Sequence, residues 1–145
     1  MKTKLILLVA FTSVLFMACS VSPKPINYGQ DHCHFCDMTV VDKTHASEYT
    51  TKKGKSFSFD AIECMTREIV RKNIEKDLAF ILVADYTNPG KLVDAKTATF
   101  LISEKIKSPM GENLSAFTSK AAAKKALAEN GGKLYTWDAL KQIIK

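Results

Sequence analysis

The residues best suited to chemistry lie in one short segment of the chain. Residues 31–38 read DHCHFCDM, and five of these eight side chains can donate sulfur or nitrogen to a metal. Thiolate and thioether together select soft ions such as Cu(I), whereas zinc prefers thiolate and imidazole and takes methionine poorly. Met38, two residues after Cys36, therefore favours a copper site over a zinc site.

The pair Cys33 and Cys36 admits other chemistry, because Cys-x-x-Cys spacing brings two sulfurs together in redox pairs, zinc sites and soft-metal sites alike. No second such pair follows, so a closed zinc site would have to borrow His32, His34 or Cys64. A thioredoxin-like pair opens a helix after a strand, whereas this pair precedes a predicted strand. Thiol-disulfide exchange through Cys33 and Cys36 is the main alternative to metal binding, and a fixed disulfide between them is another.

Two further sulfur-bearing residues lie far along the chain. Cys64 falls in the first turns of a predicted helix, off its apolar stripe, where the helix dipole favours a thiolate. It is a candidate to pair with Cys33 or to add a sulfur to the site. Met110 lies in the segment 108–111, SPMG, where proline fixes the backbone and glycine permits a reversal, so its thioether would be held at a rigid turn. His45 lies within a predicted strand and is expected to be structural.

An α+β fold with two similar halves would position these residues. The predicted strands, recognised as β-formers between turn signals, span residues 39–51, 56–59, 78–86, 97–103, 114–117 and 134–135. The predicted helices, recognised by helical spacing of apolar residues, span residues 60–73, 119–130 and 136–144. Asp60 and Glu63 are expected to form a capping box at the first helix. We therefore expect two β-β-α-β units, residues 31–88 and 91–145, which pack together because neither could bury an adequate core alone.

The first residues are typical of an exported lipoprotein. Residues 1–18 combine two lysines with an apolar run that is too short to span a bilayer, as in a cleaved signal peptide. Cys19 follows an alanine and resembles the cysteine of a bacterial lipobox, although the leucine lies one position farther away than usual. We expect Cys19 to carry acyl chains, palmitate among them, and residues 19–30 to form a polar tether. The protein would then be anchored in the cell envelope, facing the periplasm.

Charge and composition argue against a nucleic-acid partner. The 145 residues contain 21 Lys and Arg against 15 Asp and Glu, and removal of the two signal-peptide lysines lowers the net charge from +6 to +4. The remaining lysines are scattered, and no aromatic-basic stripe is present for stacking on bases. An apolar fraction of 46% is that of an ordinary globular protein.

At the residues described above, the chain resembles the NosL family of lipoprotein copper chaperones, which are associated with nitrous oxide reductase. The matching features, in chain order, are the lipobox at Cys19, Tyr28-Gly29, the segment 33–38, the helix start at Phe59-Asp60 with Cys64, and the turn 108–111. The resemblance covers essentially the whole mature chain. It implies a fold of two β-β-α-β units that is similar in topology to part of organomercurial lyase.

The resemblance also implies a function and a set of ligands. Proteins of this family bind one Cu(I) and deliver it toward the copper-sulfide centre of nitrous oxide reductase, and they are not enzymes. The implied ligands are Cys36, Met38 and Met110, and the further candidates are Cys33, His32, His34 and Cys64. We therefore expect a periplasmic, lipid-anchored Cu(I) metallochaperone that hands copper to a client enzyme.

Overall fold

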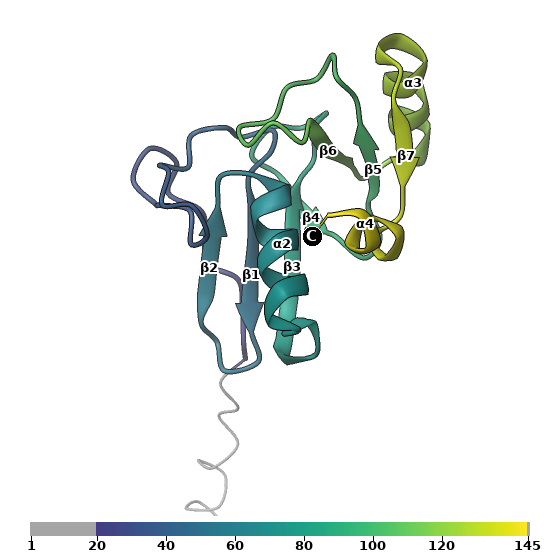
Figure 1. Cartoon of the computed structure of the whole chain (residues 1–145). Coiled ribbons are helices and arrows are strands. Elements are labelled where there is room, and N and C mark those ends of the chain that lie inside the picture. Colours follow the sequence, from purple (N-terminus) through teal and green to yellow (C-terminus); the bar gives the residue numbers. More distant parts are fainter. Residues whose placement is uncertain (1–19, 145) are drawn as a thin grey trace, which may run out of the picture.

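The computed structural model describes residues 20–144 and contains two antiparallel sheets (Figure 1). The predicted signal peptide and Cys19 lie outside the described residues. The strands of the first sheet are β1 (Ser47–Thr51), β2 (Ser56–Phe59), β3 (Leu78–Ala84) and β4 (Leu92–Asp94). Their order is β2-β1-β3-β4. None of the described helices is long and apolar enough to cross a membrane.

The second sheet and the helices complete the fold. The strands are β5 (Thr99–Ile102), β6 (Leu114–Phe117) and β7 (Lys133–Tyr135), in the order β6-β5-β7. The α-helices are α2 (Ile62–Lys72), α3 (Lys120–Asn130) and α4 (Trp137–Ile143), and a short 3-10 helix, η2, spans Glu75–Asp77. Elements β1, β2, α2 and β3 thus recur in order as β5, β6, α3 and β7, with the first strand of each set at the centre of its three. The predicted α+β class is confirmed.

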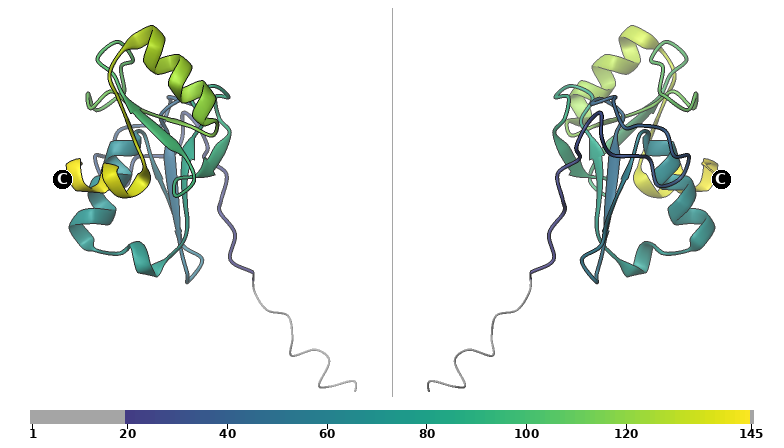
Figure 2. Two further views of the ribbon diagram at one scale, coloured as in Figure 1. Left: turned by 90° about the vertical axis from the view of Figure 1, so that its right-hand side faces the viewer. Right: turned by 90° about the vertical axis from the view of Figure 1, so that its left-hand side faces the viewer.

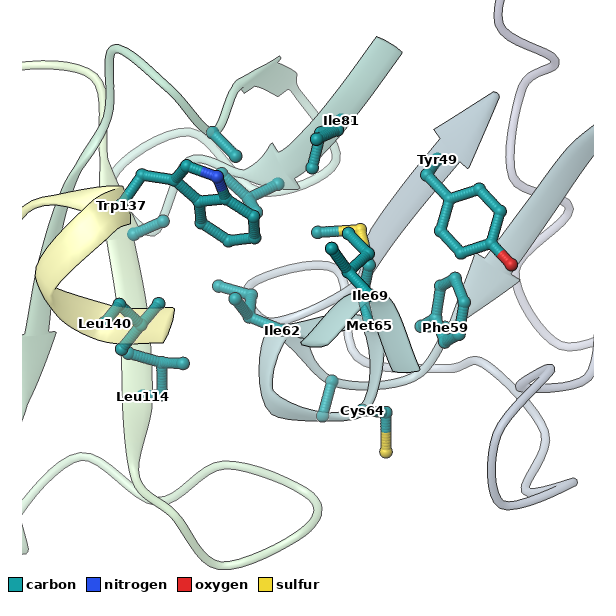
Figure 3. Close-up of a cluster of buried hydrophobic side chains, with 14 of the residues drawn as sticks. Tyr49, Phe59, Ile62, Cys64, Met65, Ile69, Ile81, Leu114, Trp137 and Leu140 are labelled. Carbon is teal, nitrogen blue, oxygen red and sulfur yellow. The ribbon is translucent and has the colours of Figure 1, made fainter. Parts of the chain in front are cut away.

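The two sheets share one core. On α2, the apolar residues Ile62, Met65 and Ile69 lie three and four positions apart and face α4, where Trp137 and Leu140 meet them (Figure 3). Phe100 and Leu114, from the second sheet, belong to the same cluster. Burial of one such side chain stabilises the folded state by about 1.5–3 kcal/mol. Helix α2 is therefore fixed against both sheets, which matters because it supports the candidate site.

The segment before β1 is a loop, whereas the sequence predicted a strand from residue 39. Val40 is fully buried with Ile26 and Ala46, but Val41 is 65% exposed. Asp42 accepts hydrogen bonds from the backbone and hydroxyl of Thr44, which stabilises a turn that breaks any strand. The strand prediction for residues 39–46 is therefore wrong, because turn chemistry overrides the β-forming valines.

The start of α2 also differs from the prediction. The N-cap is Ala61, and no side chain caps the helix. The carboxylates of Asp60 and Glu63 are both buried and engaged elsewhere, so the predicted capping box does not form. Glu63 accepts a hydrogen bond from Ser108, and Asp60 accepts one from Cys36. A further addition is β4, which pairs with β3 of the first sheet although it lies within residues 91–145, the expected second unit.

Candidate metal site

Three cysteines and one aspartate converge at the start of α2. Cys64 lies in the first turn of this helix, Asp60 precedes it, and Cys33 and Cys36 come from the loop 32–39. One donor atom from each of these four residues lies within 4.8 Å of the others. The Cys36 sulfur is 4.0 Å from that of Cys64 and 3.4 Å from Asp60 Oδ1. We call these four residues the cysteine cluster.

All three thiols of the cysteine cluster are free. The sulfurs of Cys33 and Cys36 are not joined to each other in this structure. Thiol donors crowded together without a covalent bond are typical of a soft-metal site or of a redox pair.

The loop 32–39 is fixed by its own backbone. His32 and Thr39 pair as an antiparallel bridge, and the Cys33 amide donates to the Met38 carbonyl at 2.8 Å. The Asp37 amide donates back to the Cys33 carbonyl at 2.9 Å, with Asp37 in the left-handed region at φ 63°. A further bond from the His34 amide to Ser58, also 2.9 Å, ties the loop to β2. The backbone hydrogen bonds thus hold Cys33 and Cys36 on one short, closed loop.

Burial differs sharply between the donors. Cys33 and Cys64 are inaccessible to solvent, at 2% and 0% exposure, and Cys36 is partly exposed. Figure 3 shows the Cys64 sulfur turned away from the packed residues of the core. Met38, by contrast, is 48% exposed at the end of the loop. The cluster therefore has a buried floor and a single partly open side.

Asp60 is the member that sequence reasoning missed. It is 2% exposed, and its Oδ2 atom has no hydrogen-bond partner among the described residues. An unpartnered buried carboxylate oxygen is costly and calls for an explanation, such as an absent ion. The sequence signal was present in the spacing of Asp60 four residues before Cys64, but capping rules assigned Asp60 to the helix terminus instead.

The three thiols of the cysteine cluster differ in pKa. A hydrogen bond from Cys64 lowers the pKa of Cys33 to about 7, against the opposing effect of burial. Burial raises the pKa of Cys36 to about 11. The pKa of Cys64 is raised as well, because Cys33 engages its thiol and because it is buried. Cys33 is therefore the thiol of the cluster that loses its proton first as the pH rises.

The turn that carries Met110 is fastened to the same part of α2. The Ser108 hydroxyl donates to Glu63, and Arg67 pairs with Glu112. Glu63 and Arg67 lie one residue before and three residues after Cys64, so the turn is attached on both sides of the cluster's helical cysteine. Met110 itself is half-buried against the main core. Two segments 70 residues apart in sequence, 33–38 and 108–111, thus meet the first two turns of one helix.

The two candidate histidines lie outside the cysteine cluster. His34 stacks on Phe57 with ring centroids 4.3 Å apart, and its Nε2 atom is 3.5 Å from Glu68. His32 is exposed, with Nδ1 3.0 Å from the Asp37 carbonyl oxygen. Neither belongs to the group of converging donors.

His45 is structural, as predicted. Its Nδ1 atom is 2.6 Å from Asp42, and its Nε2 atom is 3.1 Å from the Ser115 hydroxyl. This order of acid, imidazole and hydroxyl is that of a hydrolase triad, but Ser115 is fully buried in β6 and no substrate can reach it. The His45 network, which we define as these three residues, instead joins the loop before β1 to the second sheet.

Together, the fold and the cluster define a small α+β protein with a preformed soft-metal donor set. The NosL family profile matches residues 25–144, and the chain belongs to the NosL family. A curated relative, the copper-binding lipoprotein NosL of Stutzerimonas stutzeri, is 21% identical over 130 residues, which are 81% of this chain. The chain spans 65%, about two thirds, of that relative's length.

A solved structure has the same fold. The crystal structure of the copper chaperone NosL from Shewanella denitrificans superposes with a TM-score of 0.72 at 22% identity, covering 82% of this chain and 95% of that one. Both relatives are named for copper binding or copper delivery rather than for catalysis, in agreement with the expectation that this chain is not an enzyme.

Proposed function

We propose that this protein is a periplasmic Cu(I) chaperone, anchored to a membrane by lipid on Cys19. The observation that carries the proposal is the convergence of three free thiols and a buried carboxylate within 4.8 Å at the start of α2. Thiolate donors select soft monovalent copper over harder ions. Family membership and the names of the two relatives support the same conclusion.

In this proposal Cys36, Met38 and Met110 bind the cargo ion, with Cys33 and Cys64 as sulfurs behind them. Cys36 is suited to a central role because it is the partly exposed member of the cluster and contacts Cys64. Met38 is suited to first contact with incoming copper because its side chain is exposed on the loop that carries Cys36. His32 and His34, at the rim, are not needed for coordination.

Charge supports the choice of a monovalent ion. A thiolate ligand compensates the charge of Cu(I), and a compensated ion is far less costly to bury than an ion with an uncompensated charge. A site with its solvent side open also gives a client's ligand a place to enter, so that copper moves through a mixed complex before the donor sulfurs leave.

The client we propose is nitrous oxide reductase, at its copper-sulfide centre. This part of the proposal comes from the family resemblance, and the reductase would be the acceptor in a transfer assay. Anchoring in the cell envelope is supported by the lipoprotein name of the Stutzerimonas relative.

The test of the proposal is an anaerobic titration of the reduced protein with Cu(I) in competition with a chromogenic chelator. We expect one Cu(I) per chain, and subsequent transfer to the copper-free reductase. Retention of no copper against the chelator would overturn metal binding. Equal retention by a variant with serine at positions 33, 36 and 64 would overturn the site.

Thiol-disulfide exchange is the second candidate. The pKa of about 7 at Cys33 favours it, because a thiolate is the attacking species in exchange. Against it, Cys33 is 2% exposed, so a substrate disulfide could not reach its sulfur without opening of the loop. Thiol-disulfide exchange predicts a reversible two-electron couple whose reduction potential is unaffected by the substitutions Met38→Ala and Met110→Ala. It would be favoured if both variants matched the wild type in reduction potential and in the Cu(I) titration.

A further inference from the structure

A basic surface lies at the end of the first sheet that is remote from the cysteine cluster. The turn between β1 and β2 carries Lys52, Lys53 and Lys55, all exposed. They line a shallow hollow of about 550 Å³ together with Thr51, Phe57 and a single acidic residue, Asp77. The Lys55 ammonium lies 4.8 Å from the centre of the Phe57 ring. We call this surface the hairpin end.

The neighbouring 3-10 helix adds to the charge of the hairpin end. The Lys52 amide donates to the Asp77 carbonyl at 2.9 Å, which joins η2 to the turn. Lys76, next to Asp77, is exposed. Of the acidic side chains nearby, Glu75 is already paired with Lys141, so it does not neutralise the surface lysines.

The described chain begins at the same end. The Lys24 amide donates to Glu48 of β1 at 3.2 Å, and the residues before Lys24 run from there toward the β1–β2 turn (Figure 1). In Figure 1 the first described residues lie beside the β1–β2 turn, and the rotated views of Figure 2 place them at the same end of the molecule. A lipid anchor at Cys19, one residue before the described chain, would therefore hold this end close to a bilayer.

The cysteine cluster lies at the opposite end of α2. Cys64 is in the first turn of α2. The 3-10 helix η2 follows the last turn of α2, and the backbone hydrogen bond from Lys52 to Asp77 places the hairpin end beside it. A helix of 11 residues is roughly 16 Å long, because each residue adds about 1.5 Å. The start of α2, which carries Cys64, and the β1–β2 turn thus lie toward opposite ends of this helix (Figure 1).

From these placements we infer that the hairpin end rests on the surface of a bilayer that contains anionic phospholipid. The inference relies on the lipid anchor of the proposed function. Lysines near an anionic surface are attracted over roughly one Debye length, about 10 Å at 0.1 M salt, and the tether brings Lys52, Lys53 and Lys55 into that range. The apolar stems of these lysines suit the boundary between headgroups and water. The cysteine cluster is then presented away from the membrane, toward proteins that donate or accept copper.

Charge alone would not select this end of the molecule. Helix α3 also carries three exposed lysines, Lys120, Lys124 and Lys125, and only the last has a nearby acidic partner in Glu129. The tether distinguishes the two surfaces, because it leaves the fold at the hairpin end and not at α3. The α3 lysines therefore provide a matched internal control.

The test uses the full lipidated protein reconstituted into vesicles of phosphatidylcholine, with or without phosphatidylglycerol. Lysines are acetylated with a water-soluble reagent, and the rate at each lysine is followed by mass spectrometry. With phosphatidylglycerol present, we expect acetylation of the three hairpin lysines to slow by about threefold or more, and that of the α3 lysines to stay unchanged. High salt should remove the difference. Equal rates at both surfaces in both vesicle types would overturn the inference.

Charge-reversed variants give the second readout. In the K52E/K53E/K55E variant, Lys24 and Lys76 should lose their protection in phosphatidylglycerol vesicles, whereas in K120E/K124E/K125E they should keep it. Loss of protection in both variants would show a general charge effect and overturn the inference, as would failure of the protein to stay with vesicles of either composition. A Cu(I) titration of the same vesicles reports on the proposed function separately, since neither set of lysines belongs to the metal site.

Discussion

The cysteine cluster and the His45 network are two buried groups of polar side chains in the same small protein, and their hydrogen bonding differs. In the His45 network, Asp42, His45 and Ser115 each have a partner, and no atom of the three is left unsatisfied. In the cysteine cluster, Asp60 keeps one oxygen unpaired, and three thiols crowd together without a bond. A saturated network has no capacity for a ligand, whereas an unsaturated one is completed by it.

The two groups also differ in what they connect. The His45 network joins the loop before β1 to β6 and thereby links the two halves. The cysteine cluster joins a loop to the start of one helix, next to a partly open side. The comparison teaches that burial of polar side chains does not by itself identify a binding site, and that convergence of several donors with unmet bonding capacity is the better indicator.

The largest effect is expected for Cys36→Ser, which replaces the central thiol with a poor ligand for Cu(I). Affinity should fall by about a hundredfold or more, equivalent to about 2.7 kcal/mol, in an anaerobic competition titration. The free energy of unfolding of the metal-free protein should change by less than about 1 kcal/mol, because Cys36 is only partly buried. An unchanged affinity would remove the cluster from the metal site.

The substitution His45→Ala should show the converse behaviour. It leaves Asp42 and Ser115 without their shared partner, so the free energy of unfolding should fall by about 2–3 kcal/mol in a denaturant titration. Cu(I) affinity should be unaffected. His32→Ala, at an exposed histidine, is the control and should change stability by less than about 0.5 kcal/mol. A loss of copper binding in the His45→Ala variant would contradict the assignment of the His45 network to stability alone.

Smaller effects are expected for the thioethers. Met38→Ala or Met110→Ala should each weaken Cu(I) binding about tenfold, or about 1.4 kcal/mol, since the thiols would still bind the ion. Val41→Ala is a matched control for Met38, because it also shortens an exposed apolar side chain near the loop. If the three variants bind copper equally, the site consists of the cysteine cluster alone.

The smallest effect is a pH dependence of the His45 network. Burial raises the pKa of Asp42, but hydrogen bonds from Thr44 and His45 outweigh it and hold that pKa below its ordinary value. The stabilisation is therefore fully present above the unfolded pKa of about 3.9 and is lost as pH falls through the lower folded value. Asp42→Asn should be less stable than wild type at pH 7, and the difference should shrink below about pH 4 in urea titrations. A constant difference across that range would contradict this account.

Much of the fold and part of the site could be predicted from local sequence pattern. The α2 stripe of Ile62, Met65 and Ile69 has helical spacing, and Cys33-x-x-Cys36 is a local motif, so both are recognisable without tertiary information. Asp60 could not be assigned, because its role depends on a contact with Cys36 from a distant loop, while local rules favour a helix cap.

The errors have a similar cause. Residues 39–46 contain β-forming valines, but Val40 is buried against Ile26 and Ala46, and Asp42 forms a turn. Long-range packing and side-chain hydrogen bonding therefore decide the structure of this segment. Strand β4 is only three residues long and carries no clear alternation, so its pairing with β3 gives it a structure that local pattern does not predict.

The backbone bonds that close the loop 32–39 have a consequence for repeated use. Many small metal-binding domains lose their structure when the ion departs, and each cycle of loading must then include refolding. Here the Cys33 and Asp37 amides close the loop through backbone hydrogen bonds that use none of the donor atoms of the cysteine cluster. In the proposed function, loading and release of copper would then require no refolding of this loop.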